Sequence, residues 1–260
     1  MNSVNKTLYI PLYGKAYVSR KGLFLQDKKA EEIWDAEGFS LKGKSKSKWL
    51  AYYMGIRSAV FDDWLRQQAE AMPGGTILHL GCGLDSRVLR TGIMGLKWYD
   101  VDFPEVIAER KRYYTESDEY KMLAADLRSE AWHDEICGTS CIVVMEGVSM
   151  YMTPEALKAL LAALEKRFEK VALLMDCYTA FAAKMSAYKN PVKEVGVSAV
   201  YGVEDPAQLQ TGNLVYIKER EMTPQRYIDE LHGMERKIFS KLYAGGFSKK
   251  LYRLFEYRKG

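Results

Sequence analysis

The sequence is poor in the residues that most metal and redox chemistry requires. It has only three histidines, His79, His133 and His232, and four cysteines, and none of them falls in a C-x-x-C or H-x-x-x-H spacing. Zinc ribbons, thioredoxin-like sites and multi-histidine centres therefore have no support, and we expect no bound metal. Only seven prolines occur, and no repeat or low-complexity tract is visible. We therefore expect no linker between independently folding halves.

Long apolar runs and a strong charge of one sign are also missing. The apolar stretches 141–145 and 171–175 are far shorter than the roughly 20 residues that cross a membrane, and the first residues lack a signal-peptide core. Against 34 acidic residues stand 38 basic ones, a net charge of +4 that is too small to require a nucleic-acid or membrane partner. We expect a cytoplasmic protein, and the lysine-rich segment 41–48 is interpreted as a solvated loop.

Hydrophobic residues make up 48% of the 260, which is enough for a substantial core. Short apolar runs alternate with helical segments over the middle of the chain, at 76–80, 98–101, 121–125, 141–145 and 171–177. Strands separated by helices need crossover connections and so predict a parallel sheet. The alternating segments 214–219 and 251–257, with a predicted helix over 224–243 between them, indicate an antiparallel pair at one edge.

Helical patterns occur both before the first predicted strand and between the strands. The spacing of Ile56, Val60 and Trp64 belongs to a helical section of about seventy residues that precedes the first strand. A second helix is predicted after Thr153, which can cap it, with Pro154 at the first helical position. The second helix is expected to pack on the sheet, and the section before the sheet is expected to form a lid or a side wall.

The most informative stretch is 76–87, TILHLGCGLDSR, in which an apolar strand enters a Gly-x-Gly turn. Gly81 and Gly83 lack a Cβ and tolerate unusual backbone angles, so a ligand can approach the chain there. The third glycine of a dinucleotide fingerprint would stand at the position of Ser86, which makes a nicotinamide cofactor the second choice. We assign Cys82 and His79 to packing.

Carboxylates follow three successive predicted strands. Asp102 ends the second strand, nineteen residues after Gly83, where it can accept hydrogen bonds from both ribose hydroxyls. Asp100, two residues earlier, competes for this role, and an N-cap is the alternative for either.

The next two strands end in the same way. Asp126 and Leu127 follow the third strand and can hold the amino edge and the face of a purine, and Glu146 follows the fourth. Because ligands of open α/β sheets bind outside the carboxyl ends of the strands, these side chains should converge on one crevice.

Several of these stretches together resemble a known family. Residues 80–87 (LGCGLDSR), 101–107 (VDFPEVI) and 146–152 (EGVSMYM) look like successive motifs of the leucine carboxyl methyltransferase family. This family is a branch of the class I S-adenosylmethionine-dependent methyltransferases and includes O-methyltransferases of tetracenomycin-type polyketide synthesis. Upstream, PLYGKA (11–16), FLQD (24–27) and IRSAVFD (56–62) are similar to the bacterial members, and the resemblance spans about residues 8–177.

The resemblance implies a Rossmann-like class I methyltransferase fold, α/β, with a seven-stranded, mostly parallel sheet, an antiparallel edge and a helical N-terminal cover. It implies a single methyltransferase domain in which 1–73 form the cover, 74–177 the cofactor-binding core, and 178–260 the substrate-side segment with the edge strands. Few residues after Cys177 match the family, and the residues around Phe39 match it loosely. The resemblance therefore says little about which molecule accepts the methyl group.

The resemblance also implies roles for individual residues toward S-adenosylmethionine. The matching positions are Arg57 and Lys15 near the methionine carboxylate, Gly81 and Gly83 beneath it, Asp102 on the ribose, Asp126 and Leu127 around the adenine, and Glu146 near the methionine amino group. An arginine suits a carboxylate because its planar fork donates two parallel hydrogen bonds.

We therefore expect an S-adenosylmethionine-dependent O-methyltransferase that acts on a carboxylate or phenol oxygen of a small molecule, or on an exposed carboxyl group. The matched motifs hold no histidine, which favours either a carboxylate, because that acceptor needs no base, or a substrate that is activated by hydrogen bonding. Tyr151 is the one candidate catalytic residue, with core packing as its alternative. A catalytically inactive S-adenosylmethionine-binding sensor or scaffold and an NAD-dependent oxidoreductase are the competing hypotheses.

Overall fold

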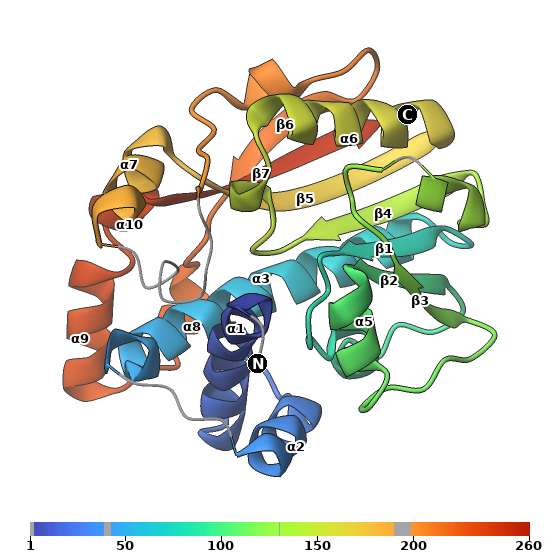
Figure 1. Cartoon of the computed structure of the whole chain (residues 1–260). Coiled ribbons are helices and arrows are strands. Elements are labelled where there is room, and N and C mark those ends of the chain that lie inside the picture. The colour runs from blue at the N-terminus through green and yellow to red at the C-terminus, as the bar shows by residue number, and fades with distance from the viewer. Residues whose placement is uncertain (1–2, 39–42, 130, 190–198) are drawn as a thin grey trace.

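The computed structural model describes residues 3–38, 43–129, 131–189 and 199–260. The centre of this part of the chain is a seven-stranded sheet with the order β3-β2-β1-β4-β5-β7-β6 (Figure 1). The strands are β1 (Thr76–Leu80), β2 (Lys97–Asp102), β3 (Tyr120–Ala124), β4 (Ser140–Met145), β5 (Lys170–Tyr178), β6 (Val215–Arg220) and β7 (Tyr252–Lys259). β1 to β5 pair in parallel, and β7 is antiparallel to both β5 and β6. The predicted mostly parallel sheet with an antiparallel edge is confirmed.

The section before β1 is helical, as predicted. It consists of α1 (Ser3–Arg20), α2 (Lys28–Glu37), the 3-10 turn η1 (Gly43–Lys46) and α3 (Lys48–Ala71). Residues 41 and 42 of the lysine-rich segment lie outside the described residues. The remainder of that segment forms η1 and leads into α3, where Lys48 pairs with Glu235 at 2.8 Å.

Further helical elements connect and follow the strands. They are α4 (Arg87–Arg90), α5 (Pro104–Arg110), η2 (Ala131–Glu135), η3 (Ser149–Tyr151), α6 (Pro154–Arg167), α7 (Ala180–Lys189), η5 (Pro206–Leu209), α8 (Gln225–Ile228), α9 (Gly233–Leu242) and α10 (Gly246–Lys249). α6 begins as predicted, because the Thr153 side chain accepts the Ala156 N–H and Pro154 takes the first helical position. None of the helices within the described ranges has the length and apolar character needed to cross a membrane.

Alternate side chains of the strands enter two separate hydrophobic clusters, one on each face of the sheet. The first cluster joins the strands to α1, α2 and α3 through residues such as Leu12, Ile33 and Phe61. The second joins them to α6 through its stripe of Leu157, Leu160, Leu161 and Leu164. Figure 1 shows α6 and the N-terminal helices on opposite sides of the sheet. The cover and the sheet therefore share one core.

The prediction of one helix over 224–243 is wrong. The structure divides it into α8 and α9, with a turn at residues 229–232. Gly233 has φ of 54°, a left-handed value that a continuous right-handed helix does not contain. The turn directs Ile228 and Leu231 into the core that α3 shares. The left-handed backbone of Gly233 accounts for the break.

Candidate active site

One cavity, of about 1120 Å³, lies along the carboxyl ends of the parallel strands. Its walls come from α1, α3, the turns after β1 to β5, and the start of β7. All nine predicted site residues line it: Lys15, Arg57, Gly81, Gly83, Asp102, Asp126, Leu127, Glu146 and Tyr151. The structure thus brings these nine residues together from the two helices α1 and α3 and from the ends of β1 to β4. The roles of these residues toward a cofactor remain predictions.

The glycine turn after β1 has the backbone geometry that the sequence predicted. Gly81 and Gly83 have φ of 68° and 52°. A Cβ on Gly81 would collide with the Val148 side chain from the turn after β4. Only glycine therefore combines this backbone conformation with so close an approach of the neighbouring turn.

Asp102 lies at the cavity with both carboxylate oxygens held by backbone groups. Oδ2 accepts the Gly83 N–H and Oδ1 accepts the Phe103 N–H, each at 2.8 Å. Burial raises the pKa of Asp102 to about 6, although these two hydrogen bonds partly oppose the shift. A carboxylate oxygen can accept more than one hydrogen bond, so both oxygens keep capacity for a ligand.

Asp100, the other acid proposed for the ribose, does not line the cavity. Its Oδ2 accepts the Tyr120 hydroxyl at 2.6 Å and also binds Arg110, while Oδ1 faces His79 Nδ1 at 3.1 Å. Burial alone would raise the pKa of Asp100, but Arg110, His79 and Tyr120 together lower it to about 2. Asp100 is a structural ion.

Asp126 and Leu127 follow β3 and line the cavity. The Asp126 carboxylate accepts the Arg128 backbone N–H at 2.9 Å and is also held by the Arg128 guanidinium. The hydrogen bond from Arg128 lowers the pKa of Asp126. Leu127 packs partly against the cluster on the α6 face of the sheet. An acid and an apolar side chain therefore stand together, as a purine site requires.

Arg57 and Glu146 form a buried ion pair between α3 and the turn after β4. Arg57 Nε donates to Glu146 Oε1 at 3.1 Å, and its Nη1 donates to Asp176 at 2.8 Å. Ser58 adds a hydroxyl donor to Glu146 at 2.8 Å. Burial would raise the pKa of Glu146, but the attraction of Arg87 and Arg57 outweighs it and holds the pKa well below its ordinary value.

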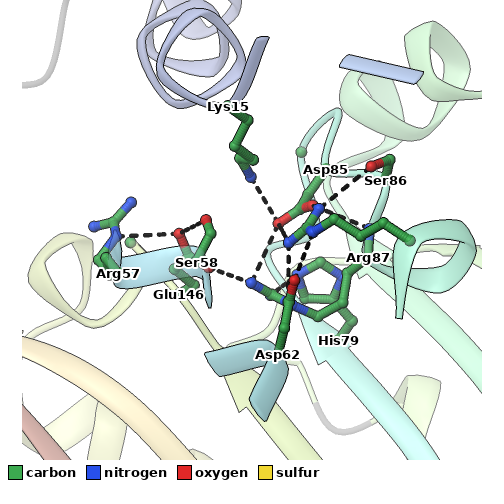
Figure 2. Close-up of polar contacts among 12 residues, drawn as sticks. Lys15, Arg57, Ser58, Asp62, His79, Asp85, Ser86, Arg87 and Glu146 are labelled. Atoms are coloured by element: carbon green, nitrogen blue, oxygen red, sulfur yellow. Dashed lines mark hydrogen bonds and ion pairs between the residues drawn. The ribbon is translucent and has the colours of Figure 1, made fainter. Parts of the chain in front are cut away.

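This pair belongs to a larger buried network, drawn in Figure 2. Lys15 Nζ lies 2.7 Å from Asp85, which also binds Arg90. Arg87 contacts Asp62 through Nε at 2.7 Å and Glu146 through Nη2. The network ties α1 and α3 to the glycine turn, to the short helix α4 and to the turn after β4. It fixes the cation and the acid that the sequence assigned to the methionine end of the cofactor.

His79 belongs to this network, which corrects its assignment to packing. Its Nε2 lies 3.1 Å from Arg87 Nη1, and its Nδ1 faces Asp100. Burial lowers the pKa of His79, so the ring is neutral at physiological pH. Cys82 is buried as expected, but it also lines the cavity.

The sequence reasoning missed the acids and arginines that hold the named residues in place, chiefly Asp62, Asp85, Arg87 and Asp176. A signal for one of them was present. Asp62 stands with Arg57 in a stretch of α3 whose other residues between 51 and 62 are apolar, aromatic or small. Charges inside such a run are buried, and buried charges need partners.

Tyr151 lies at the rim, 41% exposed. Neighbouring residues remove water from its phenol, which raises its pKa to about 12. The hydroxyl therefore stays protonated at neutral pH and is unsuited to act as a base.

Two curated proteins are similar to this chain. The tetracenomycin polyketide synthesis O-methyltransferase TcmP of Streptomyces glaucescens is 27% identical over 217 residues, covering 81% of this chain and 79% of TcmP. The S-adenosyl-L-methionine-dependent methyltransferase dpfgK of Gibberella zeae is 26% identical over 184 residues, covering 65% of this chain and 62% of dpfgK.

Solved structures share the fold. Magnesium protoporphyrin IX methyltransferase from Synechocystis PCC 6803, with bound SAH, superposes with a TM-score of 0.53 at 13% identity, covering 95% of this chain and 97% of that one. The plantazolicin methyltransferase BamL, in complex with SAH and a triazolic desmethylPZN analog, has a TM-score of 0.53 at 9% identity, with coverages of 98% and 97%. The predicted Rossmann-like methyltransferase fold is confirmed.

The model of the leucine carboxyl methyltransferase family matches residues 6–165, which is more than half of the chain. This match includes the cover, the glycine turn and the acids at the ends of β2, β3 and β4. The alternative of a nicotinamide-dependent oxidoreductase is not favoured. The chain belongs to the leucine carboxyl methyltransferase family and is a methyltransferase.

Proposed function

We propose that this protein is an S-adenosylmethionine-dependent O-methyltransferase whose acceptor is a small molecule. One observation carries the proposal. All eight residues assigned to the cofactor from the sequence line a single cavity at the strand ends. The similarity to TcmP, an O-methyltransferase of polyketide synthesis, supports an oxygen acceptor on a small molecule.

The residues that line the cavity suit S-adenosylmethionine. Gly81 and Gly83 line the cavity in the turn after β1, and Asp102 offers both carboxylate oxygens to ribose hydroxyls. Asp126 and Leu127 would hold the adenine, and the part of the cavity beside Arg57 and Lys15 would hold the amino-acid end. When bound, S-adenosylmethionine supplies a methyl group for transfer to the acceptor oxygen.

The task of the chain itself is positioning. The ion pairs of Arg57, Glu146 and Arg87 are already formed, so these groups need little rearrangement on binding. Helix α1 contributes Leu8, Pro11 and Leu12 to the wall of the cavity and keeps water from that side. Orientation and exclusion of water are the contributions that a displacement of this kind needs most.

The first experiment is calorimetric titration with S-adenosylhomocysteine, NAD and NADP. We expect binding of S-adenosylhomocysteine alone, weakened at least tenfold in Asp102→Ala and in Arg57→Ala. Asp118→Ala is a matched control because Asp118 is exposed and does not line the cavity. Preference for a nicotinamide nucleotide, or no binding at all, would overturn the proposal.

Turnover separates an enzyme from an inactive binding protein. Transfer of a labelled methyl group from S-adenosylmethionine into hydroxylated and carboxylated small molecules is the readout. Binding of S-adenosylhomocysteine without transfer to any acceptor would favour a sensor or scaffold.

A further inference from the structure

Asp176 is a buried carboxylate near the end of β5 to which neither the motifs nor the resemblance assigned a role. The parallel register pairs Met145 of β4 with Met175 of β5, and both side chains enter the cluster on the α6 face of the sheet. Because successive side chains of a strand point to opposite faces, the next residues, Glu146 and Asp176, both point toward the α3 face. Two acids from neighbouring strands therefore stand beside the helix that carries Arg57.

These two acids bind different nitrogens of the Arg57 guanidinium. Nε donates to Glu146 Oε1 at 3.1 Å (Figure 2), and Nη1 donates to Asp176 Oδ2 at 2.8 Å. Two hydrogen bonds to one planar group fix its rotation, whereas a single bond would leave the guanidinium able to turn. The two acids together therefore set the plane of the guanidinium as well as its place.

The third nitrogen of Arg57 is left for a ligand. Within the part of the chain that the structure describes, Nη2 forms no hydrogen bond. It lies against the turn after β4, since a Cβ on Gly147 would stand 3.5 Å from it, and both Arg57 and Gly147 line the cavity. The ion pairs of Arg57 thus leave N–H donors for the methionine carboxylate of the cofactor.

Asp176 also holds the turn after β4, in which Glu146 stands. Its Oδ1 accepts the Gly147 N–H at 2.7 Å, and its backbone carbonyl accepts the Ser149 hydroxyl. One carboxylate therefore fixes Arg57 with one oxygen and the neighbouring turn with the other. Asp176 is fully buried and does not line the cavity, so it acts on a ligand through these partners.

We propose that Asp176 is a positioning residue, which holds Arg57 Nη2 toward the carboxylate of the cofactor and so makes the site select ligands that carry this carboxylate. The proposal rests on the proposed function, because it takes Arg57 to be the group that receives the methionine end of S-adenosylmethionine. Without Asp176, the guanidinium keeps the bond to Glu146 and can turn away from the ligand. Affinity should then fall for ligands that carry the carboxylate and stay the same for those that lack it.

Two ligands isolate this effect, S-adenosylhomocysteine and its decarboxylated form, which keeps the nucleoside, the thioether and the amino group. Both are titrated calorimetrically into the parent protein and into Asp176→Asn. We expect the parent to bind S-adenosylhomocysteine about tenfold more tightly than the decarboxylated form. In Asp176→Asn this preference should fall about fivefold, while the affinity for the decarboxylated form changes less than about twofold.

An asparagine should be tolerated at this position. Burial raises the pKa of Asp176 in spite of the attraction of Arg57, so the folded protein readily accepts a neutral side chain there. Asparagine offers one uncharged oxygen to two donors, which weakens the hold on Arg57 whichever donor it accepts. Urea unfolding checks that the variant folds. Asp176→Ala, which removes both oxygens, replaces it if it does not.

Asp100→Asn is the matched control, because Asp100 is an equally buried strand acid that binds a different arginine, Arg110. It should leave the preference for the carboxylate unchanged within about twofold, whatever it does to the two affinities together. The double variant Arg57→Ala/Asp176→Asn should show the same preference as Arg57→Ala alone, since Asp176 acts through Arg57.

Four results would overturn the proposal. They are a parent protein without preference for the carboxylate, a preference that stays the same in Asp176→Asn, a similar fall of the preference in Asp100→Asn, and a further fall when Asp176→Asn is added to Arg57→Ala. Failure of the proposed function looks different, because the parent protein would then bind neither ligand.

Discussion

Asp102 has the most informative titration of the residues assigned to the cofactor. Its pKa is about 6 because burial disfavours the charged form, and the ionised carboxylate is the better acceptor for ribose hydroxyls. Affinity for S-adenosylhomocysteine should therefore be full above pH 7 and fall as the pH drops through 6. At pH 5 about one molecule in ten carries the charge, so Kd should rise about tenfold, as measured by calorimetry across this range.

Asp102→Asn provides the control for this pH dependence. The variant should bind more weakly at every pH, with a flat profile between pH 7.5 and 5. The effect on stability has the opposite sign. Because the folded-state pKa of Asp102 exceeds its ordinary value of 3.8, protonation favours folding, and this group's contribution to stability falls as the pH rises from 4 to 6. A wild-type Kd that is constant from pH 7.5 to 5 would exclude Asp102 from the ribose site.

Arg87 carries the largest predicted effect of a single side chain on stability. It is fully buried and pairs with Asp62 and Glu146. Arg87→Leu would leave both carboxylates without this partner, and removal of one member of a buried ion pair costs roughly 3–5 kcal/mol. Urea unfolding measures the change. Arg236→Leu breaks an exposed pair with Asp229 and should change stability by less than about 1 kcal/mol. Similar losses in the two variants would contradict the prediction.

At the scale of residues, positions that end strands were predictable and their partners were not. Gly81, Asp102 and Glu146 could be placed together because parallel strands end at one edge of a sheet. Asp85 and Arg87 stand in the same motif, but their pairing with Lys15 and Asp62 depends on how α1 and α3 cross the sheet. No spacing within a single segment determines such a contact.

The crossing of α1 and α3 depends on small residues in both helices. A Cβ on Gly55 would stand 2.7 Å from Val18 Cγ2, and one on Gly14 would stand 2.8 Å from Met54 Cβ. Gly55→Ala should therefore separate the helices, displace Lys15 on α1, and lower the unfolding free energy by about 1–3 kcal/mol in spite of the better helix propensity of alanine. Urea unfolding and S-adenosylhomocysteine titration measure the two effects.

Gly246→Ala is the matched control for this substitution. Gly246 is also helical, in α10, and nothing lies within 4 Å of its missing Cβ. Alanine there should leave stability unchanged or raise it by up to about 1 kcal/mol. If Gly55→Ala stabilised the protein to the same extent, the close approach of α1 and α3 would not limit the packing of the cover.

At the scale of elements, the sequence predicted which segments are strands better than it predicted where helices stop. The apolar alternation of 214–219 and 251–257 indicated β6 and β7 to within about two residues. It contained nothing about β7 lying between β5 and β6, since that order depends on pairing across the sheet. The break at Gly233 was missed because the buried positions of α8 and α9 continue one helical pattern through the turn.

The whole molecule should unfold as one cooperative unit in spite of its separate cover and sheet. The largest core cluster contains Leu12 and Phe61 of the cover together with Ile77 and Ile142 of the sheet. Neither part can therefore keep its buried surface when the other unfolds. Thermal transitions followed by far-ultraviolet circular dichroism and by tryptophan fluorescence should coincide.

Ligand binding extends this prediction, because the cavity has walls from both parts. S-adenosylhomocysteine at a hundred times its Kd should stabilise the folded state by about 2.7 kcal/mol, which raises Tm by roughly 5–10 °C. The transitions followed by circular dichroism and by fluorescence should shift together. If Lys15 and Arg57 hold the ligand on one side and Asp102 on the other, as we propose, the ligand binds only when the cover is docked on the sheet. A separate early transition whose temperature the ligand does not change would mean that the cover detaches without opening the site. Lys15 would then have no part in binding.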